Sequence, residues 1–329
     1  MNQAFLPASK VSISQAIFGT SRLGGTVQQY DKRASLEILN KAFESGTTTF
    51  DTANIYAQGN SEKLLGVAMK SHREKVILAT KGGYAFSSRG RFLTVIKPMV
   101  RKLIGSRPGL VRAAGKVRGG QMKQDFSRAG LTRSLDESLK RLKSDYVDIY
   151  QLHSPDEETL KRGEVFEILS DFRKEGKIRA GGVSLLSWEH LTHCYGKGVD
   201  FAQLEADFLS GVDRTRALQI AAENGVLVAA RQAFGSGLMA MDSGDWSVEQ
   251  FGGDPKRLAL AKVRMSRVRE IGDPFKVILK YLLNGSEFPA FLFATTNLRH
   301  LERNLEIMGE DFPSPEEVAI VRSALRATE

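Results

Sequence analysis

Cysteine, long apolar runs and an N-terminal signal are scarce or lacking in this chain, and each absence excludes a class of protein. The single cysteine among 329 residues, Cys194, excludes an internal disulfide and a cysteine-rich zinc site, and it suits a reducing compartment. No stretch approaches the ~18 apolar residues of a transmembrane helix. The start, MNQAFLPASK, lacks the basic and apolar regions of a signal peptide. We therefore expect a soluble, cytoplasmic protein.

Acidic residues are lacking between positions 86 and 124, and this basic segment carries the net charge. The whole chain has 47 basic and 38 acidic residues, a formal charge of +9. The basic segment holds ten basic residues and no acid, so the remainder has 37 basic against 38 acidic residues. It shows no zinc, helix-turn-helix or RNA-binding signature, so we expect no nucleic-acid partner.

A metal site is not expected either. His190 and His193 form an H-x-x-H pair, a spacing that can bind metal on a helix. No third ligand lies nearby in the sequence, so an exposed helix face explains the pair better.

Strand-like and helix-like patterns alternate along nearly the whole chain. The strand-like runs cover residues 15–20, 47–53, 75–83, 146–153, 178–184, 201–206, 226–232 and 290–296. Helical patterns lie between them, at 60–72, 132–145, 164–177, 187–196, 214–224, 274–284 and 298–308. Eight such units predict an α/β fold, a (β/α)8 TIM barrel formed by a single domain over residues 1–329. Long insertions are expected after strands 3 and 7, at about 84–127 and 233–270.

An open, doubly wound sheet is the alternative fold. A dinucleotide-binding sheet of that kind should show G-x-G-x-x-G after its first strand. The stretch FGTSRLGG does not match this motif.

Four reactive side chains fall at or just after the ends of predicted strands. Asp51 ends the second strand, Lys81 the third and His153 the fourth, and Tyr56 lies in the loop after the second strand. Barrel enzymes keep their catalytic residues at this end of the strands. Each residue alone could be a cap or a satisfied core group, but four converging positions favour catalysis.

The residue types indicate a general acid for a carbonyl oxygen. A lysine ammonium beside a tyrosine stabilises the phenolate and so makes the phenol a better acid. An aspartate would keep the buried lysine charged and fixed, because an unpaired buried ammonium is costly. A histidine could hydrogen-bond the substrate oxygen. Such a site lacks only a hydride donor.

Several stretches resemble the aldo-keto reductase superfamily, over nearly the whole chain. They are FDTANIYAQGNSEKLLG, ILATKGG, LTRSLDESLKRLKSDYVDIYQLHSPD, IRAGGVS, AFGSGLM and ATTNLRHLERNLEI. The resemblance implies a barrel that binds NADP(H) or NAD(H) without a Rossmann fold. It also implies a catalytic tetrad of Asp51, Tyr56, Lys81 and His153, with Tyr56 as proton donor.

The resemblance further implies a set of nucleotide contacts. Ser184 and Gln203 would bind the carboxamide, Phe208 would stack on the nicotinamide, and Asn304 would contact the adenine. The remaining positions are Gly19 and Thr20 on the first strand, Phe234, Gly235, Ser236, Gly237 and Leu238 along the pyrophosphate, and Ala294, Thr295, Thr296, His300 and Arg303 near the 2′ position. Leu185 replaces the asparagine that usually follows the serine. No basic residue occupies 294–297, although Arg299 and Arg303 could substitute, so both nucleotides remain open.

The substrate side departs from the family in a way that favours polar substrates. Ser21 and Ser154 stand where large aromatic residues are common, which suggests a sugar-like carbonyl or alcohol unless Phe86, Phe92 or Trp246 refills the space. The basic segment follows Lys81, so it could attract an anionic substrate. A plain lid is the simpler reading, and contact with a membrane surface is less favoured. A different class of function, a nucleotide-binding regulatory or scaffolding barrel, is the alternative to an enzyme.

Overall fold

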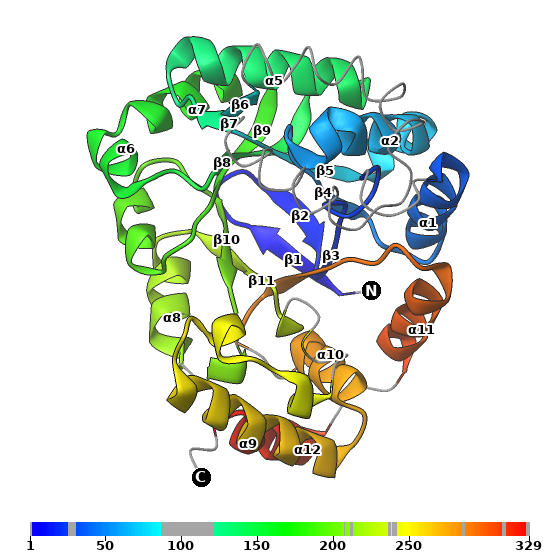
Figure 1. Ribbon diagram of the computed structural model, residues 1–329. Coiled ribbons are helices and arrows are strands. Elements are labelled where there is room, and N and C mark those ends of the chain that lie inside the picture. Colours follow the sequence, from blue (N-terminus) through cyan, green and yellow to red (C-terminus); the bar gives the residue numbers. More distant parts are fainter. Residues whose placement is uncertain are drawn as a thin grey trace, which may run out of the picture.

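The computed structural model shows a closed barrel of eight parallel strands. Their order around the barrel is β10-β11-β12-β3-β4-β5-β8-β9, and β9 pairs with β10 to close it (Figure 1). The strands are β3 (Ala16–Gly19), β4 (Thr49–Asp51), β5 (Ile77–Gly82), β8 (Val147–His153), β9 (Ile178–Ser184), β10 (Phe201–Glu205), β11 (Leu227–Arg231) and β12 (Ala290–Phe293). The predicted (β/α)8 barrel is therefore confirmed. The structure describes residues 2–25, 31–86, 122–206, 208–210, 213–235, 238, 242–284, 287–310 and 314–326.

Helices form the outer layer around these strands (Figure 1). They are α1 (Lys32–Glu44), α2 (Asn60–Ala68), α5 (Arg128–Leu142), α6 (Glu157–Arg162), α7 (Glu164–Lys174), α8 (Thr215–Glu223), α9 (Pro255–Ile271), α10 (Pro274–Asn284), α11 (Leu298–Gly309) and α12 (Pro315–Arg326). Short 3₁₀ helices cover Tyr56–Gly59, Lys70–Lys75, Glu189–Cys194, Phe208–Ser210, Ser243–Asp245 and Val248–Phe251. None of the described helices is both long and apolar enough to cross a bilayer.

Caps explain where several helices begin and end. The predicted helix 132–145 begins four residues earlier, because the Ser127 hydroxyl accepts a hydrogen bond from the Gly130 amide and caps α5. The prediction of a regular helix over 187–196 is wrong. Only a 3₁₀ stretch forms there, and the backbone turns extended at Tyr195.

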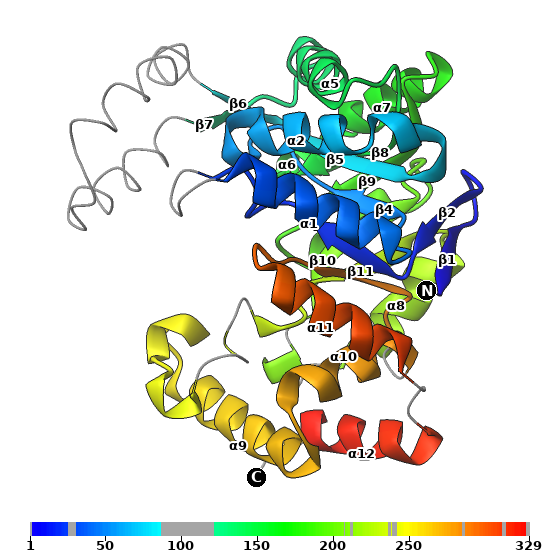
Figure 2. The same ribbon diagram turned by 90° about the vertical axis from the view of Figure 1, so that its right-hand side faces the viewer.

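An N-terminal hairpin closes one end of the barrel. Its strands are β1 (Gln3–Leu6) and β2 (Val11–Ser14), and they pair antiparallel. Leu6, Val11 and Ile13 are fully buried among barrel residues such as Ile17 and Phe201. Figure 2 shows the hairpin at the opposite end from β6 (Tyr84–Phe86) and β7 (Met122–Gln124). The hairpin therefore leaves the other end available for a site.

Alternation along the strands determines which side chains line that other end. Ala79, Ile149, Phe201 and Ala229 belong to the cluster inside the barrel. Side chains two residues apart on a strand point to the same face. The next inward positions are therefore Lys81, Gln151, Gln203 and Arg231. These polar side chains form a layer above the apolar interior.

A long segment follows β5 and precedes α5. It begins with β6 and ends with β7, and these two strands pair antiparallel. Residues 87–121 lie outside the described residues. They include nine of the ten lysine and arginine residues of the basic segment. A second long segment separates β11 from α10 and contains α9, which packs against α10 and α12.

Candidate active site

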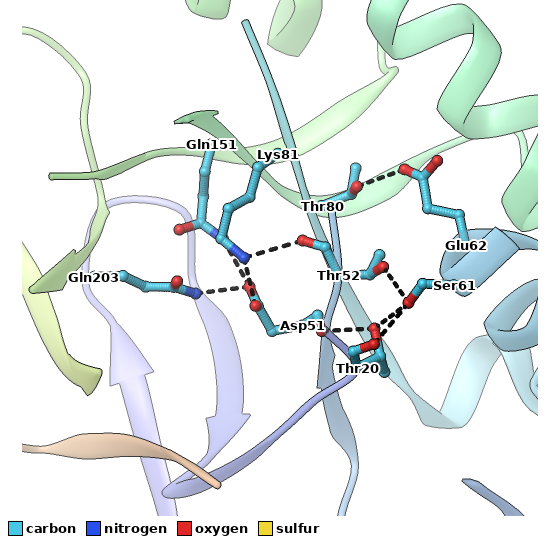
Figure 3. A network of polar contacts seen from close by, with 9 residues as sticks. All are labelled: Thr20, Asp51, Thr52, Ser61, Glu62, Thr80, Lys81, Gln151 and Gln203. Atoms are coloured by element: carbon cyan, nitrogen blue, oxygen red, sulfur yellow. Dashed lines mark hydrogen bonds and ion pairs between the residues drawn. The ribbon is translucent and has the colours of Figure 1, made fainter. Parts of the chain in front are cut away.

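Asp51 is the centre of a buried polar network at the C-terminal end of the barrel (Figure 3). Its carboxylate pairs with the Lys81 ammonium. It also accepts hydrogen bonds from Gln151 Nε2 at 3.0 Å and Gln203 Nε2 at 2.6 Å. Asp51 and Lys81 each expose only 1% of their surface. Side chains from four strands, β4, β5, β8 and β10, thus converge on one carboxylate.

Lys81 is held in its charged form. Its ammonium donates to Asp51 and, at 3.0 Å, to the carbonyl oxygen of Thr52. Burial by itself lowers the pKa of Lys81, but the Asp51 carboxylate and the Tyr56 side chain outweigh it and raise the pKa above the ordinary value of 10.5. The site therefore contains a permanent, desolvated positive charge.

Tyr56 lies beside this charge. The Lys81 Nζ is 5.2 Å from the centroid of the Tyr56 ring. Immediately after Tyr56 the chain passes through left-handed conformations at Ala57 (φ 48°), Gln58 (φ 60°) and Gly59 (φ 82°) before α2 begins. Non-glycine residues in this region are strained, and such strain is typical of functional sites. The tight turn fixes the half-buried phenol at the strand end.

His153 contacts the same phenol from β8. Its ring packs edge-on against Tyr56, with centroids 6.0 Å apart, and against Tyr84 at 5.2 Å. Burial, followed by the positive charges of Lys81 and Arg231, lowers the pKa of His153 to about 3. Its Nδ1 is buried without a hydrogen-bond partner among the described residues. The imidazole is therefore neutral near pH 7 and has hydrogen-bonding capacity left for a ligand.

A second set of hydrogen bonds fixes the strand ends behind the site (Figure 3). The Ser61 hydroxyl of α2 bonds the hydroxyls of Thr20 at 2.7 Å and Thr52 at 3.1 Å. Glu62, fully buried on the same helix, accepts from the Thr80 hydroxyl at 2.6 Å. Since Thr52 and Thr80 adjoin Asp51 and Lys81, α2 positions the ion pair. Buried, fully paired polar networks of this kind rigidify a site.

This arrangement can protonate an oxygen. Tyr56 would carry the proton, and the Lys81 ammonium would stabilise the phenolate that is left. Amino-acid side chains do not supply hydride, so reduction of a carbonyl here requires a nicotinamide or a similar donor.

Comparison with known proteins agrees with this chemistry. A model of the Aldo/keto reductase family matches residues 16–326. The chain belongs to this family. Aldo/keto reductases reduce carbonyls with NAD(P)H, and their fold is the (β/α)8 barrel found here.

Individual relatives resemble the chain to different extents. The aldo-keto reductase YhdN of Bacillus subtilis (strain 168) is 30% identical over 188 residues, which are 56% of this chain and 46% of the relative. The match thus spans about half the length of YhdN. The NADH-specific methylglyoxal reductase of Escherichia coli (strain K12) is 26% identical over 247 residues, 73% of this chain and 69% of the relative. The solved holo form of aldo-keto reductase AKR11C1 from Bacillus halodurans shares the fold, with a TM-score of 0.76 at 21% identity over 100% of this chain and 97% of that one.

The predicted carboxamide site of this aldo/keto reductase has suitable free atoms. Ser184 and Gln203 lie opposite each other on β9 and β10, and both are buried. The Gln203 side-chain nitrogen donates a hydrogen bond to Asp51. Its Oε1 is buried and has no partner among the described residues. A carboxamide NH2 group is a donor that such an oxygen would accept. The residues present therefore fit a nicotinamide.

Other predicted nucleotide residues take part in packing. The Phe208 ring packs edge-on against Tyr281 and Phe288, with centroids 5.8 and 6.1 Å apart. Phe234 stacks on Phe275 at 4.6 Å. Stacking of Phe208 on a nicotinamide therefore stays a prediction.

The remaining first-strand and loop positions are placed as follows. Gly19 ends β3. The hydroxyl of the fully buried Thr20 hydrogen-bonds the Ser61 hydroxyl and the Asp51 carbonyl oxygen. Gly235 adopts a left-handed φ of 59°, and Leu238 is half-buried. Ser236 and Gly237 lie outside the described residues.

The region predicted near the 2′ position begins α11. Ala294, Thr296 and His300 are exposed, Thr295 is half-buried, and Asn304 is buried. The Arg303 guanidinium pairs with Asp273 at 3.2 Å. The backbone amides of Arg299 and His300 donate hydrogen bonds to the side-chain oxygen of Asn297, which caps the helix.

Sequence reasoning missed three residues that border the site. Gln151 is two positions before His153 and therefore faces inward with it. Arg231 is a charged residue at the end of β11, the same signal that identified Lys81. Tyr84 is contributed by β6, whose pairing with β7 joins residues far apart in the sequence, so no local pattern indicated it.

His190 and His193, the H-x-x-H pair, lie near one carboxylate. The His193 Nε2 lies 3.2 Å from a Glu157 carboxylate oxygen, and the rings of His190 and His193 are 6.5 Å apart. Within the described ranges, no group of three or more potential metal ligands occurs.

Proposed function

We propose that this chain catalyses hydride transfer between a nicotinamide nucleotide and a small carbonyl or alcohol, with Tyr56 as general acid in the direction of reduction. The observation that supports it most strongly is the buried Lys81–Asp51 ion pair beside the Tyr56 ring. Together these groups fit acid catalysis at one oxygen.

Each side chain has a distinct role in the proposed mechanism. A nicotinamide nucleotide held by Ser184 and Gln203 would supply the hydride for the carbonyl carbon. Tyr56 gives its proton to the carbonyl oxygen as negative charge develops there, and Lys81 stabilises the resulting phenolate. Asp51 keeps Lys81 charged and in place. His153, neutral, donates a hydrogen bond that orients the carbonyl oxygen.

Gln203 and Ser184 would hold the nicotinamide carboxamide. The Oε1 of Gln203, which has no partner among the described residues, supports this role. The Gln203 amide nitrogen donates to Asp51, so the same carboxylate would position both the carboxamide-binding residue and Lys81. Both NADP(H) and NAD(H) remain candidates. The NADH-specific relative from Escherichia coli favours the second.

The substrate is proposed to be polar and sugar-like. Ser154 is buried with a left-handed φ of 53°, and Ser21 is exposed, so neither place holds a large ring. Trp246 packs on Phe251 and donates to the Leu238 carbonyl at 3.2 Å, which supports a pocket that this ring does not fill. Tyr84 gives the site one aromatic neighbour. Steering of anions by the basic segment is a further part of the proposal, as is a cytoplasmic location, which rests on the scarcity of cysteine.

A titration followed by an activity screen tests the proposed function. The protein is mixed with NADH or NADPH, and quenching of its fluorescence gives the dissociation constants. Oxidation of the nucleotide is then followed with a panel of aldehydes and ketones. We expect binding and multiple turnovers with at least one polar aldehyde. Failure of both nucleotides to bind at high micromolar concentration would contradict the proposal, and binding without turnover would favour a regulatory or scaffolding barrel.

A further inference from the structure

Arg231 places a guanidinium beside the residues proposed to bind the carboxamide. It is the last residue of β11, two positions after the inward-facing Ala229, so its side chain is directed to the inside of the barrel. Its Nη2 donates to the carbonyl oxygen of Leu185 at 3.0 Å, which requires the side chain to reach across β10 to the end of β9. Leu185 directly follows Ser184, and its own amide donates to the Gln203 carbonyl at 3.0 Å. The guanidinium therefore lies at the strand ends that carry both carboxamide-binding residues.

This guanidinium gives the site a net positive charge. No carboxylate of the described residues lies within 4.0 Å of it, and its Nε is buried without a hydrogen-bond partner among them. Its neighbour in register on β10, Glu205, is exposed and lies beyond that distance. The other inward-facing cation, Lys81, is neutralised by Asp51. The inward-facing side chains described at this end of the barrel therefore leave one positive charge without a close counter-ion, where partial burial weakens its screening by water.

The charge of Arg231 acts on the reacting end of the site. After burial and Lys81, it is the third cause that lowers the pKa of His153. The His153 ring lies against Tyr56, the proposed proton donor. The field of Arg231 thus extends from the carboxamide-binding residues to the residues around the proposed acid, and a nicotinamide held there would experience it.

The two redox states of a nicotinamide differ in charge. The oxidised ring is a pyridinium with one positive charge, whereas the reduced dihydropyridine is neutral. A fixed cation repels the pyridinium and is attracted by the π-electrons of the neutral ring. Charges beside the ring are one of the means by which a protein tunes this cofactor. The phosphates are the same in both states, so contact with them would not discriminate between the two.

We propose that Arg231 makes this site bind the reduced nicotinamide nucleotide in preference to the oxidised one. This inference rests on the proposed function and specifies which redox state of the cofactor the site selects. An unpaired charge that disfavours one of two ligands is a common source of specificity. The preference would favour carbonyl reduction over alcohol oxidation, because the oxidised nucleotide would leave readily and compete weakly with the reduced one.

Calorimetric titration with three ligands tests the proposal without any turnover. The ligands are NADH, NAD+ and ADP-ribose, which has the adenosine and both phosphates but no nicotinamide. If the wild type binds NADPH more tightly than NADH, then NADPH, NADP+ and 2′-phospho-ADP-ribose are used. The variants are Arg231→Gln and Arg231→Lys, and the matched control is Arg216→Gln, which changes an exposed arginine on α8 that pairs with Glu223 at 3.8 Å. Circular dichroism verifies that each variant folds.

The expected result is a change in the ratio of two dissociation constants, that of the oxidised nucleotide over that of the reduced one. In Arg231→Gln this ratio should fall by at least about tenfold, because loss of the unit charge relieves the repulsion of the pyridinium in a weakly screened site. Arg231→Lys should be intermediate, since it keeps the charge but loses the planar fork. ADP-ribose should bind wild type and Arg231→Gln within about threefold of each other, and Arg216→Gln should match wild type for all three ligands.

Three results would overturn the proposal while leaving the proposed function intact. An unchanged ratio with intact affinity for ADP-ribose would mean that the charge does not act on the nicotinamide. An equal loss of affinity for all three ligands would show that Arg231 binds a phosphate of the nucleotide. A wild type that binds the oxidised form as tightly as the reduced one would contradict the proposal even if Arg231→Gln does not fold. If the wild type binds neither NADH nor NADPH, the proposed function itself fails, and this inference fails with it.

Discussion

At the scale of single residues, Asp51 connects the acid side of the site with the cofactor side. One of its oxygens faces Lys81, and the other accepts hydrogen bonds from Gln151 and Gln203. Ionised carboxylates have enough lone pairs for all three donors. The strand-end pattern predicted the pairing with Lys81. It did not predict the two amides, because a glutamine at a strand end has no reactive group to mark it.

The low pKa of His153 predicts a specific dependence of stability on pH. In the unfolded chain its pKa returns to about 6.5, whereas in the native state it is about 3. Between these values the unfolded state binds the additional proton. The contribution to stability is therefore complete above about pH 6.5 and is lost progressively as the pH falls toward 3.

Urea unfolding of wild type and His153→Gln at pH 7.5 and pH 5.0 measures this contribution. Other groups titrate in both proteins, so the difference between the two pH responses isolates His153. The free energy of unfolding of the wild type should fall by about 1–2 kcal/mol more than that of the variant. Identical pH responses would mean that His153 is solvated and titrates normally in the native state.

At the scale of elements, the strands were the most predictable feature. Each is buried on both faces and so appears in the sequence as a short apolar run, and all eight were predicted within two or three residues. The hairpin of β1 and β2 was not predicted, because two four-residue strands are too short for a clear alternating pattern. In α9, the buried Arg264 donates to the Leu209 carbonyl at 2.7 Å. A buried arginine interrupts the apolar stripe by which a helix is recognised.

The site was predictable to the extent that it depends on strand ends. Asp51, Lys81 and His153 each end a strand, and Tyr56 follows one. Tyr84 could not be predicted in the same way, since its place beside His153 depends on how the segment after β5 folds back through β6 and β7.

The start of α11 predicts weak discrimination between NADH and NADPH. Arg303 is paired with Asp273, and the first free amides of the helix are occupied by the Asn297 cap, so the described residues offer little to a 2′-phosphate. We expect kcat/KM values for the two nucleotides within about tenfold of each other. A preference for NADPH above about a hundredfold, roughly 2.7 kcal/mol, would show that Arg299 or Arg303 reaches the phosphate. Asp273→Asn is the informative variant, because it releases Arg303 and should improve NADPH selectively.

At the scale of the whole molecule, stability and chemistry are separated along the barrel axis. The hairpin closes the N-terminal end with apolar side chains, while the polar layer around Asp51 lies at the C-terminal ends of the barrel strands. Barrel folds commonly divide these tasks between their two faces. A change in the hairpin should therefore alter stability without altering the site.

Ile13→Ala tests this separation. Ile13 is fully buried under the barrel, and its truncation should lower the free energy of unfolding by about 2–5 kcal/mol. Phe5→Ala on the same hairpin is the control, because Phe5 is 55% exposed and should matter far less. In folded protein, turnover and the NADH dissociation constant should match wild type for both variants. A change in either constant for Ile13→Ala would mean that the two ends are coupled.

The general-acid role of Tyr56 is tested most directly by single-turnover reduction with Tyr56→Phe. The substitution removes only the hydroxyl, so the ring can still pack against His153 and Lys81. With NADH or NADPH bound and an aldehyde added, nucleotide absorbance follows the hydride-transfer step itself, and a fluorescence titration gives the nucleotide dissociation constant in the same samples. We expect the rate to fall by about 10²- to 10⁴-fold while the dissociation constant stays within about threefold of wild type. A variant that keeps more than about a tenth of the wild-type rate would contradict proton donation by Tyr56.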